Sequence, residues 1–201
     1  MTQLSFNETG AKFIESGEGD PVICLTETSS TLLEYLAAEL FHVLAIAPSA
    51  LPGDNAPARA AALKAMAKAR GLESFALLAS GDAAGIALQL AADHADAVPT
   101  LALLSPTFFN ADGLAADLAL GARLGEVKAQ VLTLFGTADK TSPPARGGHY
   151  KRALATCHLV YVFDAANTAS ERPQAVTEAV SDFLKRRDAF LVNNRDQRLF
   201  A

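Results

Sequence analysis

The sequence predicts an α/β fold, a three-layer αβα sandwich in which helices cover both faces of a mostly parallel sheet. First, apolar strand-like runs alternate with helical patterns, which favours right-handed βαβ crossovers. Second, residues 21–25 (PVICL) are apolar without a break, as in a strand buried on both faces of a parallel sheet. Third, two short extended segments near the N-terminus flank a turn-forming stretch, which predicts an antiparallel hairpin.

Eight strands are expected, each a short run bounded by turn-forming residues. The hairpin strands are 3–7 and 11–15, joined by a turn at 7–10, and the others are 21–25, 42–47, 74–79, 100–104, 130–135 and 158–163. Helical patterns occupy about 32–40, 58–70, 83–92 and 145–156, and a last helix begins at Pro173, where a missing N–H costs nothing. We expect a single domain over 1–201.

The composition excludes several classes of function. Half of the residues are hydrophobic and 19% are charged, which is typical of a globular protein. The net charge of -5 argues against nucleic acid and anionic membranes as partners. The sequence contains neither a signal-peptide pattern nor a membrane-span pattern, so a cytoplasmic location is expected. Cys24 and Cys157 lie in or beside apolar runs and are interpreted as buried thiols, and no cofactor or metal site is expected.

Residues 75–91 (FALLASGDAAGIALQLA) contain the pattern that says most about function. They predict a strand, a tight turn lined by small residues, and a helix. This is the layout of a nucleophile elbow, in which a sharp strand-to-helix turn exposes a reactive side chain between small neighbours. The residue at the position of the nucleophile is Gly81, which has no side chain.

Further segments occur in an order that points to one family. They are FIESGEGDPV at 13–22, PSALPG at 48–53, AADHADAV at 91–98, FGTADKTSPP at 135–144 and ERPQAV at 171–176. With the elbow, they make nearly the whole chain resemble the α/β-hydrolase superfamily. The resemblance implies an eight-stranded sheet with an antiparallel second strand. The cap that this family usually inserts after the sixth strand is reduced to about 106–127.

The resemblance also implies which residues stand at the catalytic positions. Asp139 occupies the position of the triad acid. Gly81 replaces the nucleophile, and Asn167 replaces the histidine, or Ala166 does so if the gap is placed differently. Neither Asn167 nor Ala166 can act as a base near neutral pH.

The family's His-Gly pair after the third strand, near the oxyanion hole, is also absent. Thr26 and Glu27 stand there, and Asp82 completes the expected oxyanion and pocket set. Acyl transfer needs a nucleophile, a base, an orienting carboxylate and oxyanion donors. Three of these four parts have changed, so little ester or amide hydrolysis is expected.

The favoured hypothesis is a catalytically degenerate homologue of the α/β-hydrolases that binds a small apolar ligand or a protein partner, which includes a homo-oligomer. The short cap would leave apolar surface uncovered around 106–125, at Phe108, Phe109, Leu114, Leu118 and Leu120. The alternative for these side chains is that they close the pocket.

A second hypothesis is an enzyme with displaced chemistry. Asp82 would serve as nucleophile, as an aspartate does in haloalkane dehalogenases, or Asp139 would act with Asn167 in a lyase-like or isomerase-like reaction. The competing interpretation of Asp82 is a helix N-cap. A third hypothesis is an ordinary serine hydrolase that uses Ser105 or Ser30, although neither stands at an elbow.

Overall fold

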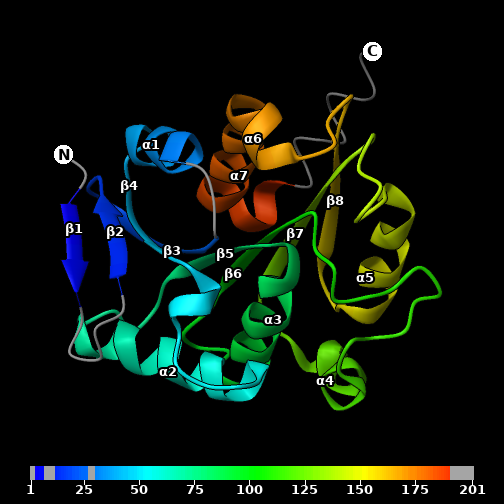
Figure 1. The fold of residues 1–201 in the computed structure, drawn as a ribbon, viewed down its shortest axis with the longest axis horizontal. Helices are drawn as coiled ribbons and strands as arrows, with labels where there is room; N and C mark the ends of the chain where they lie inside the picture. The colour runs from blue at the N-terminus through cyan, green and yellow to red at the C-terminus, as the bar shows by residue number, and fades with distance from the viewer. Residues whose placement is uncertain (1–2, 7–11, 27–29, 191–201) are drawn as a thin grey trace.

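A computed structural model describes residues 3–6, 12–26 and 30–190, so the turn expected at 7–10 lies outside the described residues. Eight strands form one sheet in the order β1-β2-β4-β3-β5-β6-β7-β8, which confirms the predicted strand number (Figure 1). Their bounds are β1 (Gln3–Phe6), β2 (Lys12–Ser16), β3 (Asp20–Leu25), β4 (Phe41–Ile46), β5 (Ala76–Ser80), β6 (Thr100–Leu104), β7 (Gln130–Gly136) and β8 (Cys157–Val162).

The strand directions also follow the prediction. β1 pairs with β2, and β2 with β4, in antiparallel register, whereas every pair from β4 to β8 is parallel. The apolar run 21–25 falls in β3, whose side chains from Val22 to Leu25 are buried. Because the parallel strands all end at the same edge, the loops that follow them meet there.

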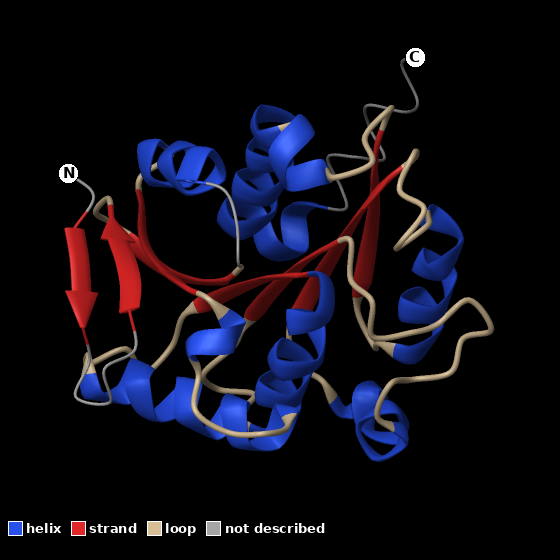
Figure 2. Cartoon of the chain, viewed as in Figure 1, coloured by secondary structure: helices blue, strands red, loops and turns tan. Residues whose placement is uncertain are grey.

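Helices cover both faces of the sheet, which confirms the three-layer architecture (Figure 2). On one face lie α1 (Ser30–Ala38), α6 (Thr168–Glu171) and α7 (Pro173–Arg186), above the sheet in Figure 1. On the other lie α2 (Ala56–Ala69), α3 (Ala84–Asp93), α4 (Leu118–Arg123) and α5 (Gly147–Ala153). Short 3-10 helices connect them: η1 (Pro48–Ala50), η2 (Gly81–Ala83), η3 (Leu124–Glu126), η4 (Pro144–Arg146) and η5 (Arg187–Ala189).

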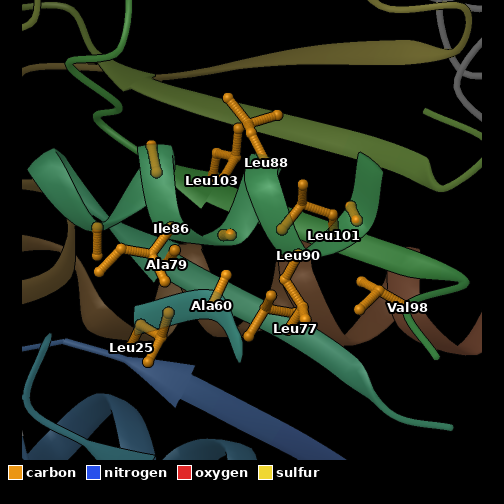
Figure 3. Close-up of a cluster of buried hydrophobic side chains, with 14 of the residues drawn as sticks. Leu25, Ala60, Leu77, Ala79, Ile86, Leu88, Leu90, Val98, Leu101 and Leu103 are labelled. Carbon is orange, nitrogen blue, oxygen red and sulfur yellow. The ribbon is translucent and has the colours of Figure 1, made fainter. Parts of the chain in front are cut away.

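Each face of the sheet has its own buried apolar cluster. In the larger cluster, Leu90 of α3 lies beside Leu77 of β5 (Figure 3). Ile86 and Leu88 of the same helix lie toward Ala79 and Leu103. Helix α3 begins directly after the turn that follows β5, so this packing fixes the turn between two rigid elements.

Both cysteines are free thiols inside these clusters. Burial raises the pKa of Cys24 to about 12, and it also raises the pKa of Cys157. A thiol reacts as the thiolate, so burial makes both side chains poor nucleophiles.

The stretch 106–127 is only partly exposed. Phe108, Phe109 and Leu120 are buried in the larger cluster, so the expectation of uncovered apolar surface is wrong for these three. The ring of Phe109 packs edge-on against Tyr150 of α5, with ring centroids 4.9 Å apart. Leu114 and Leu118 are 59% and 72% exposed. They are the large apolar side chains that this stretch leaves open to solvent.

Candidate functional site

A pocket of about 550 Å³ opens at the carboxyl edge of the parallel strands. Its walls come from the segments that follow β4, β5, β6, β7 and β8. Gly81, Asp82, Asp139, Ala166 and Asn167 all line it, although they come from three separate regions of the chain. Ligands of open α/β sheets bind at this edge, so the pocket is the candidate functional site.

Gly81 lies at the sharp turn between β5 and α3. Its φ is +55°, in the left-handed region that side chains other than glycine rarely adopt. A Cβ placed on Gly81 would meet no heavy atom within 4 Å. The turn therefore has the geometry that would present a side chain to open space at the pocket, and glycine leaves that space empty.

Asp82 follows Gly81, and its exposed side chain lines the pocket. The interpretation of Asp82 as a helix N-cap is wrong. The N-cap residues of η2 and α3 are Ser80 and Ala83, and neither makes a side-chain cap hydrogen bond. Instead, the Asp82 carboxylate accepts a hydrogen bond from the Thr107 hydroxyl, which ties the turn to the segment after β6.

Thr26 directly follows β3 and contacts the end of β5, next to the turn. It is buried, and its hydroxyl accepts a hydrogen bond of 3.1 Å from Ser80, the last residue of β5. Its backbone N–H donates to the Ile46 carbonyl at 3.3 Å and so continues the pairing of β3 with β4. Thr26 is not among the described residues that line the pocket. Glu27 lies outside the described residues.

Asp139 lies in the loop after β7 and is 8% exposed. Its Oδ1 accepts hydrogen bonds from the backbone N–H groups of Thr141 and Ser142, both at 2.8 Å. The Ser142 hydroxyl in turn donates to the Pro106 carbonyl at 2.6 Å. The carboxylate of Asp139 therefore organises its own loop, and Ser142 anchors that loop to the segment after β6.

Backbone hydrogen bonds hold the Asp139 loop against the segment that follows β8. The N–H groups of Thr137 and Ala138 donate to the carbonyls of Val162 and Ala165, each at 3.0 Å. Gly136 is needed here, because a Cβ at this position would collide with the Ala165 carbonyl oxygen. This close approach brings the loop that carries Asp139 next to the segment that carries Asn167.

Asn167 is the N-cap of α6. Its side-chain oxygen accepts a hydrogen bond of 3.2 Å from the Ser170 N–H, as cap residues typically do. The preceding Ala166 N–H donates to the Glu171 carboxylate at 2.9 Å. The amide of Asn167 thus has a structural partner.

Of two further lining residues, Arg59 escaped the sequence analysis, and Ser105 was named there only as an alternative nucleophile. Arg59 of α2 donates a hydrogen bond from Nε–H to the Gly53 carbonyl at 2.9 Å. Among the described lining residues, it is the one with a positively charged side chain. Ser105 follows β6 with a φ of +44°. Its Oγ is buried without a hydrogen-bond partner among the described residues. A weak signal existed for Arg59, because cations are disfavoured near helix N-termini. No local pattern indicated the left-handed backbone of Ser105.

Neither a metal centre nor a membrane-spanning helix is found in the part of the chain that the structure describes. No cluster of three His, Cys, Asp or Glu side chains there has an arrangement that could hold a metal ion. None of its helices combines the length and the apolar character that crossing a bilayer requires.

Comparison of the sequence with family models and with curated proteins finds no match. Solved structures do match. An α/β hydrolase enzyme from the sediment metagenome of the Mar Chica lagoon superposes with a TM-score of 0.77 at 19% identity, over 92% of this chain and 99% of that one. The 2-hydroxy-6-oxo-6-phenylhexa-2,4-dienoate hydrolase of Rhodococcus sp. strain RHA1 gives 0.76 at 14% identity, over 92% and 100%.

The naproxen esterase of Bacillus subtilis gives a TM-score of 0.73 at 14% identity, over 92% of each chain. Each of the three structures covers 92% of this chain. At such low sequence identity, a structural match shows a shared fold and does not show a shared activity. Together with the strand order, the antiparallel second strand and the turn after β5, the matches establish that the chain has the α/β-hydrolase fold.

Proposed function

We propose that this protein is a non-catalytic binding protein on the α/β-hydrolase fold, and that it holds a small molecule in the pocket at the carboxyl edge of its sheet. The observation that carries the proposal is Gly81. It lies at the turn after β5, where this fold exposes its nucleophile, and it brings no side chain to the pocket.

The rest of the pocket supports the same conclusion. Asn167 and Ala166, at the expected position of the base, have no group that accepts a proton near neutral pH. Loss of a triad member leaves only about 10³–10⁴-fold acceleration over water in serine proteases. Asp139 has a structural role in its loop that needs no histidine.

The lining suits a ligand that carries hydrogen-bonding groups as well as apolar surface, rather than the wholly apolar ligand that the sequence predicts. Most lining residues have polar side chains and none of the described ones is aromatic, while apolar atoms contribute the larger part of the lining surface. Ligand pockets are more often lined mainly by hydrophobic and aromatic side chains. Within 106–127, the exposed apolar side chains that could serve a protein partner are reduced to Leu114 and Leu118, so we favour a small molecule.

The test is labelling with a fluorophosphonate probe, together with turnover of p-nitrophenyl acetate and butyrate. The purified protein and a Gly81→Ala variant should remain unlabelled and show background turnover. Gly81→Ser should gain weak labelling, and adding Asn167→His should increase it, because a base is then available. Strong labelling of the parent protein would overturn the proposal, and the labelled peptide would locate the nucleophile.

A second candidate function is an enzyme that uses Asp82. The observation in its favour is that the Asp82 carboxylate is exposed in the pocket next to Gly81 and is oriented by Thr107. Against it, the residue at the turn's left-handed position is Gly81 and not Asp82. An Asp82→Asn variant decides: a substrate turned over by the parent and not by this variant would support the enzyme.

A further inference from the structure

Arg59 is the feature of the pocket that neither the fold nor the proposed function explains. It lies within the first turns of α2, four residues after the N-cap Asn55. A cation there opposes the helix macrodipole, so helix formation gives no reason for it. Among the described residues it forms no ion pair with a carboxylate, in contrast to Arg70, which pairs with Glu15 at 3.2 Å.

The loop before α2 holds the Arg59 side chain in place. Gly53 has a φ of +117°, and a Cβ on it would lie 2.6 Å from the Cβ of Ala58. Glycine lets the loop lie close against the helix, and the Gly53 carbonyl then accepts the Nε–H of Arg59 at 2.9 Å. This bond occupies Nε. The half-buried Arg59 side chain lines the pocket, and its two Nη groups form no ion pair with a carboxylate of the described residues.

The geometry points to a carboxylate on the ligand. A guanidinium binds a carboxylate with two parallel hydrogen bonds, and the free Nη edge suits that arrangement. A phosphate is less suitable, because Arg59 is the cation among the described lining residues and Asp82 and Asp139 share the pocket. Two acidic side chains would repel a dianion more than a monoanion.

The remaining walls define the body of the ligand. Hydroxyl side chains among the lining residues include Ser49, Ser80, Thr107 and Thr141. Asp82 and Asp139 add carboxylate oxygens, which accept hydrogen bonds from hydroxyl donors. Such a lining suits a small molecule with several hydroxyl groups. A volume of about 550 Å³ is large enough for a six-carbon compound.

We propose that the pocket binds a small polyhydroxylated carboxylate as a monoanion, with the carboxylate on Arg59 and the hydroxyl groups toward Asp82 and Asp139. This inference rests on the proposed binding function and names its ligand class. It requires no covalent step.

Isothermal titration calorimetry with four compounds tests the proposal. The probe is gluconate. Sorbitol keeps the carbon chain and the hydroxyl groups without the charge, hexanoate keeps the carboxylate without the hydroxyl groups, and sorbitol 6-phosphate replaces the carboxylate by a dianion. Gluconate should bind at least about tenfold more tightly than each of the other three.

Variants assign the binding to Arg59. Arg59→Gln should weaken gluconate binding at least about tenfold, and Arg59→Lys should weaken it less, because it keeps the charge and loses the paired geometry. Lys68→Gln is the matched control, since it removes the same charge from the exposed last turn of α2. It should leave binding unchanged. Thermal unfolding of each variant verifies that it is folded.

The ligand class would be overturned by no gluconate binding up to about 10 mM, by equal binding to Arg59→Gln, or by tighter binding of sorbitol 6-phosphate. Binding of sorbitol without binding of gluconate would also overturn the proposed ligand class, although it would support the proposal that the pocket binds a small molecule. The proposed function fails by a different measurement, namely ester turnover or probe labelling by the parent protein. The two failures are therefore distinguishable.

Discussion

The turn at Gly81 and the loop at Asp139 lie in the same pocket, yet they depend on their residues in opposite ways. At Gly81 the backbone adopts a left-handed conformation and nothing approaches the place of a side chain. At the Asp139 loop, the side chain holds two backbone N–H groups, and neighbouring Gly136 is pressed against Ala165. The first position can change its side chain at modest cost, whereas the second is fixed by packing and hydrogen bonding. The presence of a catalytic-type aspartate is therefore weak support for catalysis here.

Adding one methyl group to Gly136 and, separately, to Gly81 tests the difference between the two regions most directly. Gly136→Ala places a Cβ against the Ala165 carbonyl, and we expect it to lower the free energy of unfolding by about 3 kcal/mol. In Gly81→Ala the added Cβ contacts no atom, and only the left-handed backbone is unfavourable. We expect this variant to lower the free energy of unfolding by about 1 kcal/mol. Urea unfolding measures both. Equal losses would contradict the difference between the two regions.

The role of Asp139 separates into hydrogen bonding and charge. Asp139→Ala leaves the N–H groups of Thr141 and Ser142 without their acceptor, and it should lower the free energy of unfolding by about 2 kcal/mol. Asp139→Asn keeps an oxygen that can accept both bonds, so it should lose less than half as much. Thermal and urea unfolding of the two variants provide the measurement. If Asp139→Asn lowers the free energy of unfolding as much as Asp139→Ala does, the charge of Asp139 and not its hydrogen bonding stabilises the loop.

Two serines of the pocket lining offer a smaller contrast. The buried hydroxyl of Ser142 donates to Pro106, so Ser142→Ala should lower the free energy of unfolding by about 1 kcal/mol. The Ser105 hydroxyl is buried without a partner among the described residues, so Ser105→Ala should raise that free energy by about 0.5 kcal/mol. Matched urea titrations compare them. A loss at both positions would mean that the Ser105 hydroxyl has a partner in solution.

The smallest effect lies away from the pocket, at Asp93. Its pKa is lowered from the ordinary value of 3.8, first by the hydrogen bond from Gln89 and then by Arg123, against the effect of burial. Because the folded-state pKa lies below the unfolded one, the stabilisation is present above about pH 4 and is lost as the pH falls through the folded value.

Asp93→Asn should therefore lower the free energy of unfolding by about 0.5 kcal/mol at neutral pH and by progressively less in acid. Asp96→Asn is the control, since Asp96 forms no ion pair among the described residues. Urea titrations across the acid range give the measurement. A loss at Asp93 that grows in acid would show that its carboxylate is not stabilised in the folded state.

The fold was predictable because its signals are local. The parallel strands contain apolar runs, such as 21–25 in β3, and α7 begins at Pro173, whose fixed φ suits a first helical turn. Gly81, Asp139 and Asn167 line one pocket, as the resemblance implies. This agrees with the common edge at which parallel strands end.

The details of the site were not predictable, because they depend on contacts between distant segments. Asp82 has the sequence context of a helix cap, but Thr107, 25 residues away, determines its hydrogen bond. Thr26 follows β3 as expected, yet its N–H continues the sheet pairing to Ile46. Arg59 reaches the pocket because Gly53 folds back on α2, which no helical pattern indicates.

The burial of Cys24 and Cys157 makes the folded chain suitable for site-specific fluorescence labelling. Neither native thiol is expected to react with a maleimide dye near neutral pH, because both are buried and their pKa values are raised. A Gly81→Cys variant would then carry a single reactive thiol, in the open space at the turn. A dye attached there would report occupancy of the pocket directly, in a protein whose proposed activity produces no product to assay.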